Sequence, residues 1–205
     1  MKLDKYRKKR NFGITPEPEG STKPPKGKGK QLIFVVQEHL ASHLHYDFRL
    51  EWRGVLLSWA IPKGPSLDPS VKRLAVPTEN HPLEYANFEG IIPPGEYGAG
   101  TVMVWDGGKW IPEDPDVDAD LKEGELKFTL EGKKLKGAWV MVRARGGWSG
   151  SSDKPYWMLI KHRDAFASKE DITKTEPLSA ISGRSLQQIT KAGAQGAEKA
   201  SRTSS

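Results

Sequence analysis

The stretch His43-Leu44-His45-Tyr46-Asp47-Phe48-Arg49-Leu50-Glu51 decides how the middle of this 205-residue chain folds. Its apolar residues alternate strictly with polar ones, and this period of two is typical of a β-strand with one buried face. Arg53-Gly54 follows as a turn signal, and Val55 to Ile61 is a second apolar run. Together the two runs predict a β-hairpin.

Similar short runs extend in both directions from this hairpin. They are Leu32 to Val36, Arg73 to Val76, Thr101 to Trp105, Glu125 to Leu130, Ala138 to Arg145 and Tyr156 to Lys161. Because no long amphipathic helix interrupts them, these strands predict an all-β, mainly antiparallel fold. We expect a compact closed or nearly closed barrel of about eight strands, with short helices and long loops. The acidic stretch Ile111 to Glu125 is predicted to be a solvated loop.

Composition divides the chain into three parts. Residues 1–30 contain ten Lys and Arg against three acidic residues, so the other 175 residues carry a net charge of −1 within the total of +6. We predict a basic arm over 1–30 that partly docks on the barrel, a barrel domain over 31–167, and a flexible tail over 168–205. In the tail only Ser185 to Lys191 is expected to form a short helix. The basic arm predicts phosphate contacts with nucleic acid.

The composition also excludes several classes of protein. The chain has no Cys, which excludes disulfides, thiolate zinc sites and a cysteine nucleophile. It has no signal-peptide pattern and no run of about 18 apolar residues, so we expect a soluble intracellular protein with no membrane partner. Gly95 to Gly100 lacks the Gly-Lys-Ser/Thr that follows in a P-loop, and we expect an ordinary loop with glycines at positive φ.

Histidines gather around the alternating strand. His45 and Asp47 point the same way on a strand, and His39 can join them if the chain bends at Leu40 to Ser42. Two imidazoles and one carboxylate suit Mn, Fe or Zn better than Mg or Ca. Arg49 lies on the same face, and a guanidinium beside a metal ion predicts a phosphate or carboxylate guest. His81 is a candidate donor to that anion or to a leaving oxygen.

The stretch Gln37 to Leu50 resembles the 3′-phosphoesterase module of the bacterial and archaeal end-joining DNA ligase D family. Further matches follow in order at Ser58 to Ser66, Lys72 to Val76, Glu79 to Tyr85 and Gly95 to Thr101. The resemblance covers about Leu3 to Ala167. It implies a β-barrel phosphodiesterase that uses manganese to remove a 3′-terminal ribonucleoside. A phosphomonoesterase step then removes the remaining 3′-phosphate and leaves a 3′-hydroxyl.

The same resemblance implies roles for individual residues. The metal ligands fall on His39, His45 and Asp47, with Mn²⁺ as the ion and Zn²⁺ or another divalent transition metal as alternatives. Catalytic or phosphate-contacting roles fall on Arg49, Arg73, His81 and Tyr85, and substrate-binding roles on Arg10, Asn11, Glu17, Gln37, His43, Lys63 and Glu79. Asn11 replaces the family's Asp. An amide cannot act as a base or carry a negative charge, so this departure affects the diesterase step.

The implied substrates are the 3′ ends of DNA, or of DNA that contains ribonucleotides, at primer-templates. We expect a stand-alone monomer in the prokaryotic cytoplasm, associated with the nucleoid, that passes ends to a separate ligase and polymerase. Two alternatives stay open. His45-Tyr46-Asp47 with His81 also fits the H-x-D…H order of non-haem iron oxygenases. The other alternative is a catalytically inactive barrel that binds nucleic acid as an adaptor in end joining.

Overall fold

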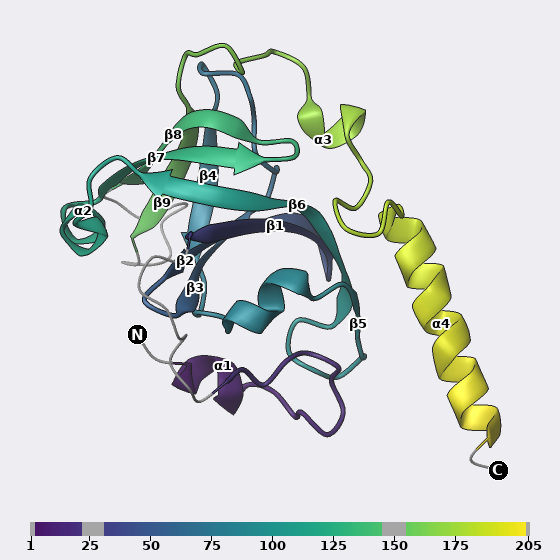
Figure 1. The fold of residues 1–205 in the computed structure, drawn as a ribbon. Helices are drawn as coiled ribbons and strands as arrows, with labels where there is room; N and C mark the ends of the chain where they lie inside the picture. The colour runs from purple at the N-terminus through teal and green to yellow at the C-terminus, as the bar shows by residue number, and fades with distance from the viewer. Residues whose placement is uncertain (1–2, 22–30, 145–154, 204–205) are drawn as a thin grey trace.

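A computed structural model of the chain describes residues 3–21, 31–144 and 155–203, with side chains up to residue 195. Figure 1 shows strands that wrap around one core, with short helices and one long C-terminal helix outside it. The strands in these ranges are β1 (Ile33–Leu40), β2 (Leu44–Trp52), β3 (Val55–Ile61), β4 (Lys72–Pro77), β5 (Gly90–Ile92), β6 (Gly100–Pro112), β7 (Glu125–Gly132), β8 (Lys136–Ala144) and β9 (Tyr156–Lys161). The helices are α1 (Asp4–Lys8), the 3₁₀ helix η1 (Leu83–Asn87), α2 (Val117–Glu123), α3 (Ile172–Thr175) and α4 (Leu186–Thr203).

The sheet closes because β1 pairs along both of its edges. The strand order is β1-β2-β3-β4-β9-β8-β7-β6-β5, all neighbours are antiparallel, and β1 also pairs with β6. Eight strands therefore form a closed barrel, and the three-residue β5 lies beside the start of β6. Closure satisfies the hydrogen-bonding edges that an open sheet would expose. The predicted all-β barrel is confirmed.

Aromatic side chains fill the inside of the barrel. Trp105, Trp110 and Trp139 are the largest of the fully buried side chains. Phe48 from β2 stacks on Phe128 from β7, with 6.0 Å between ring centroids. Burying a side chain of this size contributes about 1.5–3 kcal/mol. Because the chain contains no cysteine, this apolar core replaces the disulfides that stabilise many small β-domains.

Strand β2 has the predicted alternation. Tyr46, Phe48 and Leu50 are buried in the core, whereas Leu44 is 45% exposed because it begins the strand beyond the core. Arg53-Gly54 joins β2 to β3 with φ values of 48° and 80°. Two positive values are those of a type I′ turn, whose twist matches that of the paired strands. The predicted hairpin is therefore present.

The acidic stretch Ile111 to Glu125 differs from the predicted solvated loop. Strand β6 continues to Pro112, and α2 follows from Val117 to Glu123. The Asp116 side chain accepts a hydrogen bond from the Ala119 amide at 3.1 Å, and Gly124 ends the helix with φ of 93°. An aspartate cap and a terminal glycine stabilise even a short helix. Counting charges alone therefore missed the capping role of Asp116.

The predicted flexible tail packs against the barrel over the part where side chains are described. Ile172, Leu186 and Ile189 belong to the hydrophobic core and are at most 6% exposed. The indole N–H of Trp105 donates to the Glu176 carbonyl at 2.8 Å. Helix α4 also extends to Thr203, well beyond the predicted Ser185 to Lys191. No helix among the described residues has the length and apolar character needed to cross a membrane.

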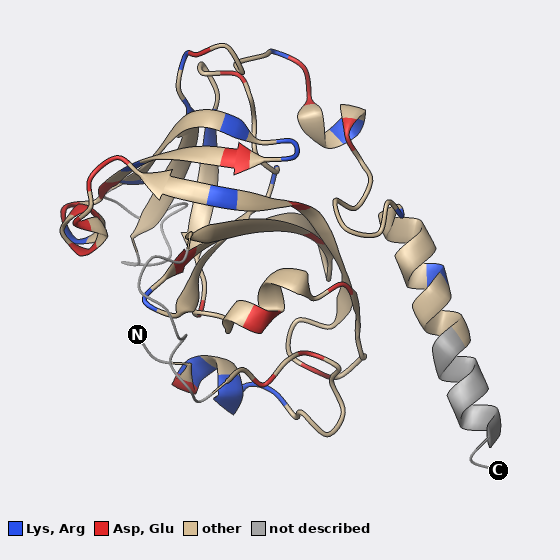
Figure 2. Cartoon of the chain, in the orientation of Figure 1, with Lys and Arg blue, Asp and Glu red and all other residues tan. Residues whose placement is uncertain are grey.

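The described part of the arm, residues 3–21, lies against the barrel. Tyr6 of α1 is fully buried, and its hydroxyl donates to the Pro18 carbonyl at 2.6 Å. Figure 2 shows Lys and Arg on α1 and acidic residues on and around α2, on a different side of the barrel. The second basic cluster of the sequence, Lys23 to Lys30, lies outside the described residues.

Candidate active site

The three predicted metal ligands meet on the outer face of the β1–β2 hairpin. The register pairs His39 with His45, and Asp47 follows two residues along β2. Asp47 Oδ2 lies 3.7 Å from His39 Nδ1 and 3.8 Å from His45 Nε2. The three ligand atoms all lie within 4.8 Å of one another. A bend at residues 41–43, one residue beyond the predicted Leu40 to Ser42, thus brings His39 to the other two.

Backbone carbonyls set the tautomers of the two histidines. His39 Nε2 lies 2.9 Å from the Gly98 carbonyl, and His45 Nδ1 lies 3.0 Å from the His43 carbonyl. A carbonyl oxygen can only accept, so each of these nitrogens carries the hydrogen. The other two nitrogens, His39 Nδ1 and His45 Nε2, therefore direct lone pairs toward Asp47. In metal sites, a carbonyl that accepts from one ring nitrogen orients the imidazole so that its other nitrogen can bind the ion.

Arg49 is buried beside the three ligands, and hydrogen bonds hold its guanidinium in place. Its Nε donates to Gln37 Oε1 at 2.8 Å, and its Nη2 donates to Asp47 Oδ2 at 3.1 Å. Gln37 in turn donates to the carbonyls of Tyr85 and Phe88. Burial would raise the pKa of Asp47, but the adjacent Arg49 guanidinium holds it well below its ordinary value. Asp47 is therefore a carboxylate available to a cation.

His81 lies between two guanidinium groups. Its Nδ1 is 2.9 Å from the Glu79 carbonyl and 2.9 Å from Arg49 Nη1, and its Nε2 is 3.3 Å from Arg10 Nη2. With hydrogen on Nδ1 the ring donates to the Glu79 carbonyl and accepts from Arg10, and with hydrogen on Nε2 it accepts from Arg49 instead. Burial first, then Arg49 and Arg10, lower the His81 pKa well below its usual value. The ring is therefore neutral and keeps one nitrogen that can accept a proton.

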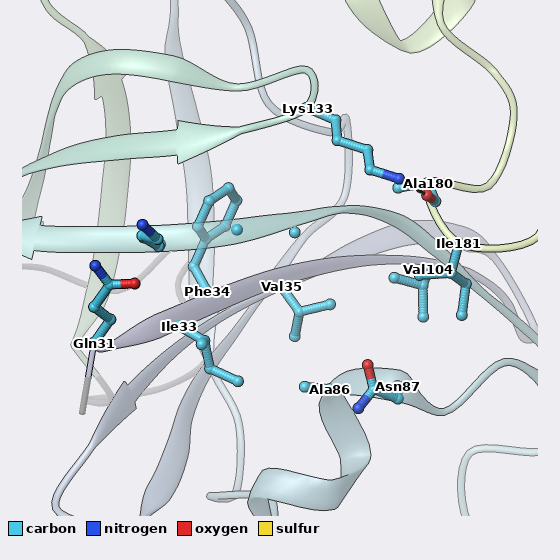
Figure 3. A pocket seen from close by; sticks show the side chains of 13 residues that line it. Gln31, Ile33, Phe34, Val35, Ala86, Asn87, Val104, Lys133, Ala180 and Ile181 are labelled. Carbon is cyan, nitrogen blue, oxygen red and sulfur yellow. Dashed lines mark hydrogen bonds between the residues drawn. The ribbon is translucent and has the colours of Figure 1, made fainter.

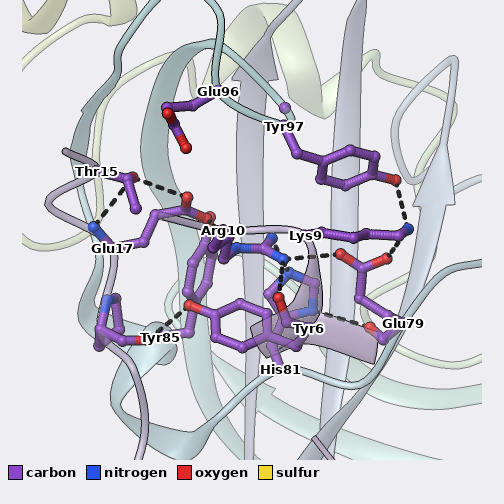
Figure 4. Close-up of polar contacts among 12 residues, drawn as sticks. Tyr6, Lys9, Arg10, Thr15, Glu17, Glu79, His81, Tyr85, Glu96 and Tyr97 are labelled. Carbon is purple, nitrogen blue, oxygen red and sulfur yellow. Dashed lines mark hydrogen bonds and ion pairs between the residues drawn. The ribbon is translucent and has the colours of Figure 1, made fainter. Parts of the chain in front are cut away.

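The arm supplies Arg10 to this site (Figure 4). The Arg10 side chain is 3% exposed and donates to Glu17 at 2.9 Å and to Glu79 at 3.0 Å. Tyr85 donates its hydroxyl to the same Glu17 oxygen at 2.9 Å. Burial and the Glu17 charge raise the pKa of Tyr85 well above its usual value, so it stays protonated. The predicted Arg10, Glu17, Glu79 and Tyr85 thus form one connected network.

A cavity of about 270 Å³ joins the metal-ligand triad to this network. Its lining residues are Arg10, His39, Ala41, His45, Asp47, Arg49, Ala60, Thr78, Glu79, His81, Tyr85, Ile92, Tyr97 and Gly98. A larger hollow of about 520 Å³ lies between β1, β6 and Ala180-Ile181 (Figure 3). That hollow is mostly apolar and includes none of the predicted site residues, so size alone does not locate the chemistry.

Six predicted site residues do not line the cavity. Two of them, Glu17 and Gln37, are buried and hold Arg10 and Arg49, which do line it. Arg73 shares a face of β4 with the core residue Ala75, and its Nε has no hydrogen-bond partner among the described residues. Lys63 is exposed beyond the end of β3. His43 is also exposed, and its carbonyl rather than its ring acts on His45. Asn11 is exposed, with its side-chain oxygen accepting from the Gly13 amide.

The structure adds residues that the sequence did not single out. Gly98, at a φ of 77°, provides the carbonyl that orients His39. Tyr97 and Lys9 meet at the cavity, with the ammonium 3.0 Å from the hydroxyl. The stretch Gly95 to Gly100 has positive φ at its three glycines, as predicted for a loop. An aromatic residue in a glycine-rich loop was the available signal for Tyr97.

The structure also distinguishes between the two sets of metal ligands that the sequence allowed. An oxygenase of the H-x-D…H type would use His81 as its second histidine. In the structure His39 joins His45 and Asp47 instead, while both ring nitrogens of His81 face other partners. His81 instead lies beside Arg10 and Arg49, next to the three ligands.

Comparisons with known proteins agree on one family. The family model of the DNA ligase D 3′-phosphoesterase domain matches residues 37–143. The multifunctional non-homologous end joining protein LigD of Pseudomonas aeruginosa is 51% identical over 189 residues, covering 90% of this chain and 22% of that protein. The LigD repair protein of Mycobacterium tuberculosis is 48% identical over 145 residues, covering 71% of the chain and 19% of that protein. The chain therefore spans about a fifth of the length of these relatives.

Proposed function

Because the chain belongs to the DNA ligase D 3′-phosphoesterase domain family, we propose that it is a metal-dependent hydrolase that repairs DNA 3′ ends for end joining. It would remove a 3′-terminal ribonucleoside and then the remaining 3′-phosphate. The observation that carries this proposal is the meeting of His39, His45 and Asp47 with Arg49 and His81 in one cavity. Metal ligands beside fixed cations are suited to phosphate ester hydrolysis.

The donor set fits a divalent transition metal. Both histidine tautomers leave lone pairs directed at Asp47, and the atoms lie 3.7–3.8 Å from its Oδ2. Ligand atoms about 2.0–2.2 Å from a common ion lie at similar separations. We propose Mn²⁺, with Zn²⁺ or another divalent transition metal as alternatives, held by these three residues. Such an ion would polarise a phosphate oxygen and stabilise developing negative charge.

Arg49 and Arg10 are the cations that we assign to the phosphate. Gln37 and Asp47 hold the Arg49 guanidinium in place, so little conformational entropy is lost when it binds an anion. Glu17 and Glu79 hold Arg10 in the same way. Two preorganised guanidinium groups stabilise the charge that develops in an in-line displacement. Tyr85 is a positioning residue for Arg10, because its hydroxyl binds Glu17.

His81 is assigned a different role from the predicted proton donor. Its ring is neutral, so one of its two nitrogens carries a lone pair. Two adjacent guanidinium groups oppose protonation of the free enzyme, so the geometry favours accepting a proton from the attacking water. Binding of the phosphate dianion would offset these two positive charges and make that proton transfer easier.

The proposal extends to substrates and partners. The DNA substrate is a primer-template 3′ end, with or without a terminal ribonucleotide. Exposed Lys5 and Lys8 of α1 are available to its phosphate backbone. Asn11 cannot act as a base, so we expect the diesterase step to be the slower one. We also propose that the chain acts as a monomer, near the nucleoid of the prokaryotic cytoplasm, before a separate ligase and polymerase.

A labelled primer-template with one 3′-terminal ribonucleotide tests the function directly. With Mn²⁺ we expect stepwise loss of the nucleoside and then of the phosphate, and with a chelator we expect no reaction. Asp47→Asn is the matched control for a contaminating nuclease, because it removes a ligand charge at constant shape. An unchanged primer in all samples, together with retained DNA binding, would contradict the proposal and favour the inactive adaptor.

A further inference from the structure

The loop between β5 and β6, residues 93–99, lies at the cavity and contacts both sides of it. On the metal side, its Gly98 carbonyl accepts from His39 Nε2. On the arm side, the Tyr97 hydroxyl lies 3.0 Å from Lys9 Nζ, and Glu96 accepts from the Asn11 amide at 3.3 Å. Figure 4 shows Tyr97 and Lys9 beside Glu79 and Arg10. This loop therefore borders the place where a bound nucleotide would enter.

Tyr97 is an unusual side chain at this position. It is 50% exposed, and among the exposed large hydrophobic side chains of the described residues it is the one that lines this cavity. The Lys9 ammonium lies 4.1 Å from its ring centroid and is also paired with Glu79. Arg10 lies 5.7 Å from the same centroid. A half-exposed aromatic ring beside cations is a typical platform for a nucleobase.

The cavity is too small for a whole nucleotide to be enclosed. Its volume of about 270 Å³ is below the roughly 300–1,000 Å³ of sites that enclose drug-sized ligands. The fixed cations Arg10 and Arg49 occupy its inner part, so the phosphate belongs there. The base attached to that phosphate through its sugar must then lie outside, on the rim.

We propose that Tyr97 stacks on the base of the 3′-terminal nucleotide whose 3′-phosphate is bound by Arg10 and Arg49. This inference rests on the proposed function. It makes Tyr97 a specificity-determining residue that separates nucleotide ends from small phosphate esters. The ring, rather than the hydroxyl, is the part that binds, and any of the four bases would be accepted, because every base has a stacking face.

The test compares wild type, Tyr97→Leu and Tyr97→Phe on two primer-templates. One primer ends in a normal nucleotide 3′-phosphate, and the other ends in an abasic 3′-phosphate. Stacking on an aromatic ring predicts that Tyr97→Leu raises KM for the normal end by about 5- to 150-fold. Tyr97→Phe should restore a near wild-type KM, and neither variant should change KM for the abasic end.

Two results would overturn the stacking role. If Tyr97→Leu raised KM equally for both primers, the residue would act by positioning the loop. If Tyr97→Phe were as weak as Tyr97→Leu, the Lys9 contact would be the important one. Should wild type release no phosphate from either primer, the proposed function fails. In that case, fluorescence anisotropy would give the dissociation constants of both primers for wild type, Tyr97→Leu and Tyr97→Phe. The stacking role predicts the same pattern in these constants as in KM.

Discussion

Both faces of strand β2 are buried over residues 46–50, but different interactions hold them. Inward, Tyr46, Phe48 and Leu50 are 0–5% exposed and pack among aromatic rings. Outward, Asp47 and Arg49 are 7% and 2% exposed, and their charges are satisfied by each other and by neighbours from β1 and the loop before η1. The inward face needs only apolar volume, whereas the outward face needs each partner at its position.

The largest effect that we expect is a loss of stability from the inward face. Phe48→Ala removes a ring that stacks on Phe128 in the centre of the barrel. The free energy of unfolding should fall by about 3–5 kcal/mol, because transfer and cavity terms add. Denaturant titration measures this change. A loss below about 1 kcal/mol would show that the core repacks and that the two faces differ less than the structure indicates.

The outward face should lose function more than stability. Asp47→Asn retains the shape of the side chain but removes the charge shared by the metal ligands and Arg49. We expect Mn²⁺ affinity and phosphate release to fall at least about 100-fold, since even second-shell changes cost 10- to 100-fold. Calorimetric titration with Mn²⁺ checks the affinity. Unaltered binding in this variant would mean that the ion lies elsewhere.

The outward face should also respond to pH, and the inward face should not. The pKa of His81 is lowered in the folded chain, so the unfolded chain binds this proton more readily. Stability from the neutral ring is therefore present above the unfolded pKa of about 6.5 and is lost as pH falls below it. The loss should approach about 1.4 kcal/mol per pH unit. The free energy of unfolding of wild type and of His81→Gln, measured at pH 7, 6 and 5 with a chelator present, tests this. If it changed with pH by the same amount in both proteins, His81 would not be the group responsible.

The smallest effect is expected at His43, next to the outward face. Its ring is exposed, while its backbone carbonyl orients His45. His43→Ala retains that carbonyl, so kcat should change by less than about threefold, well below the effect of losing a second-shell partner. Phosphate release from a 3′-phosphorylated primer measures it. A tenfold loss would instead support the substrate-binding role that the sequence predicted for the ring.

Local pattern was sufficient for the features that depend on neighbouring residues. The alternation of His43 to Glu51 predicted both faces of β2, and the short bend before it predicted that His39 joins His45 and Asp47. The fold class followed from repeated strand signals. These predictions succeeded because strand periodicity and hairpin register act over a few residues.

Features that depend on distant contacts were predicted less well. Arg73 was assigned to the site, but its parity on β4 matches the core residue Ala75. The C-terminal residues were expected to be flexible, but Ile172 and Leu186 complete the core. A register or a docking surface cannot be calculated from one segment, because the partner surface exists only after the barrel has closed.

The sequence by itself determined the strands, the charge-bearing face of β2 and the three candidate metal ligands, because side-chain direction alternates along an extended chain. Only the tertiary structure decided which nitrogen of each histidine is free, that Arg10 reaches His81, and that Tyr97 lies at the rim. Those outcomes depend on carbonyls and side chains that are far apart in the sequence. Closing the barrel and docking the arm bring them within hydrogen-bonding distance.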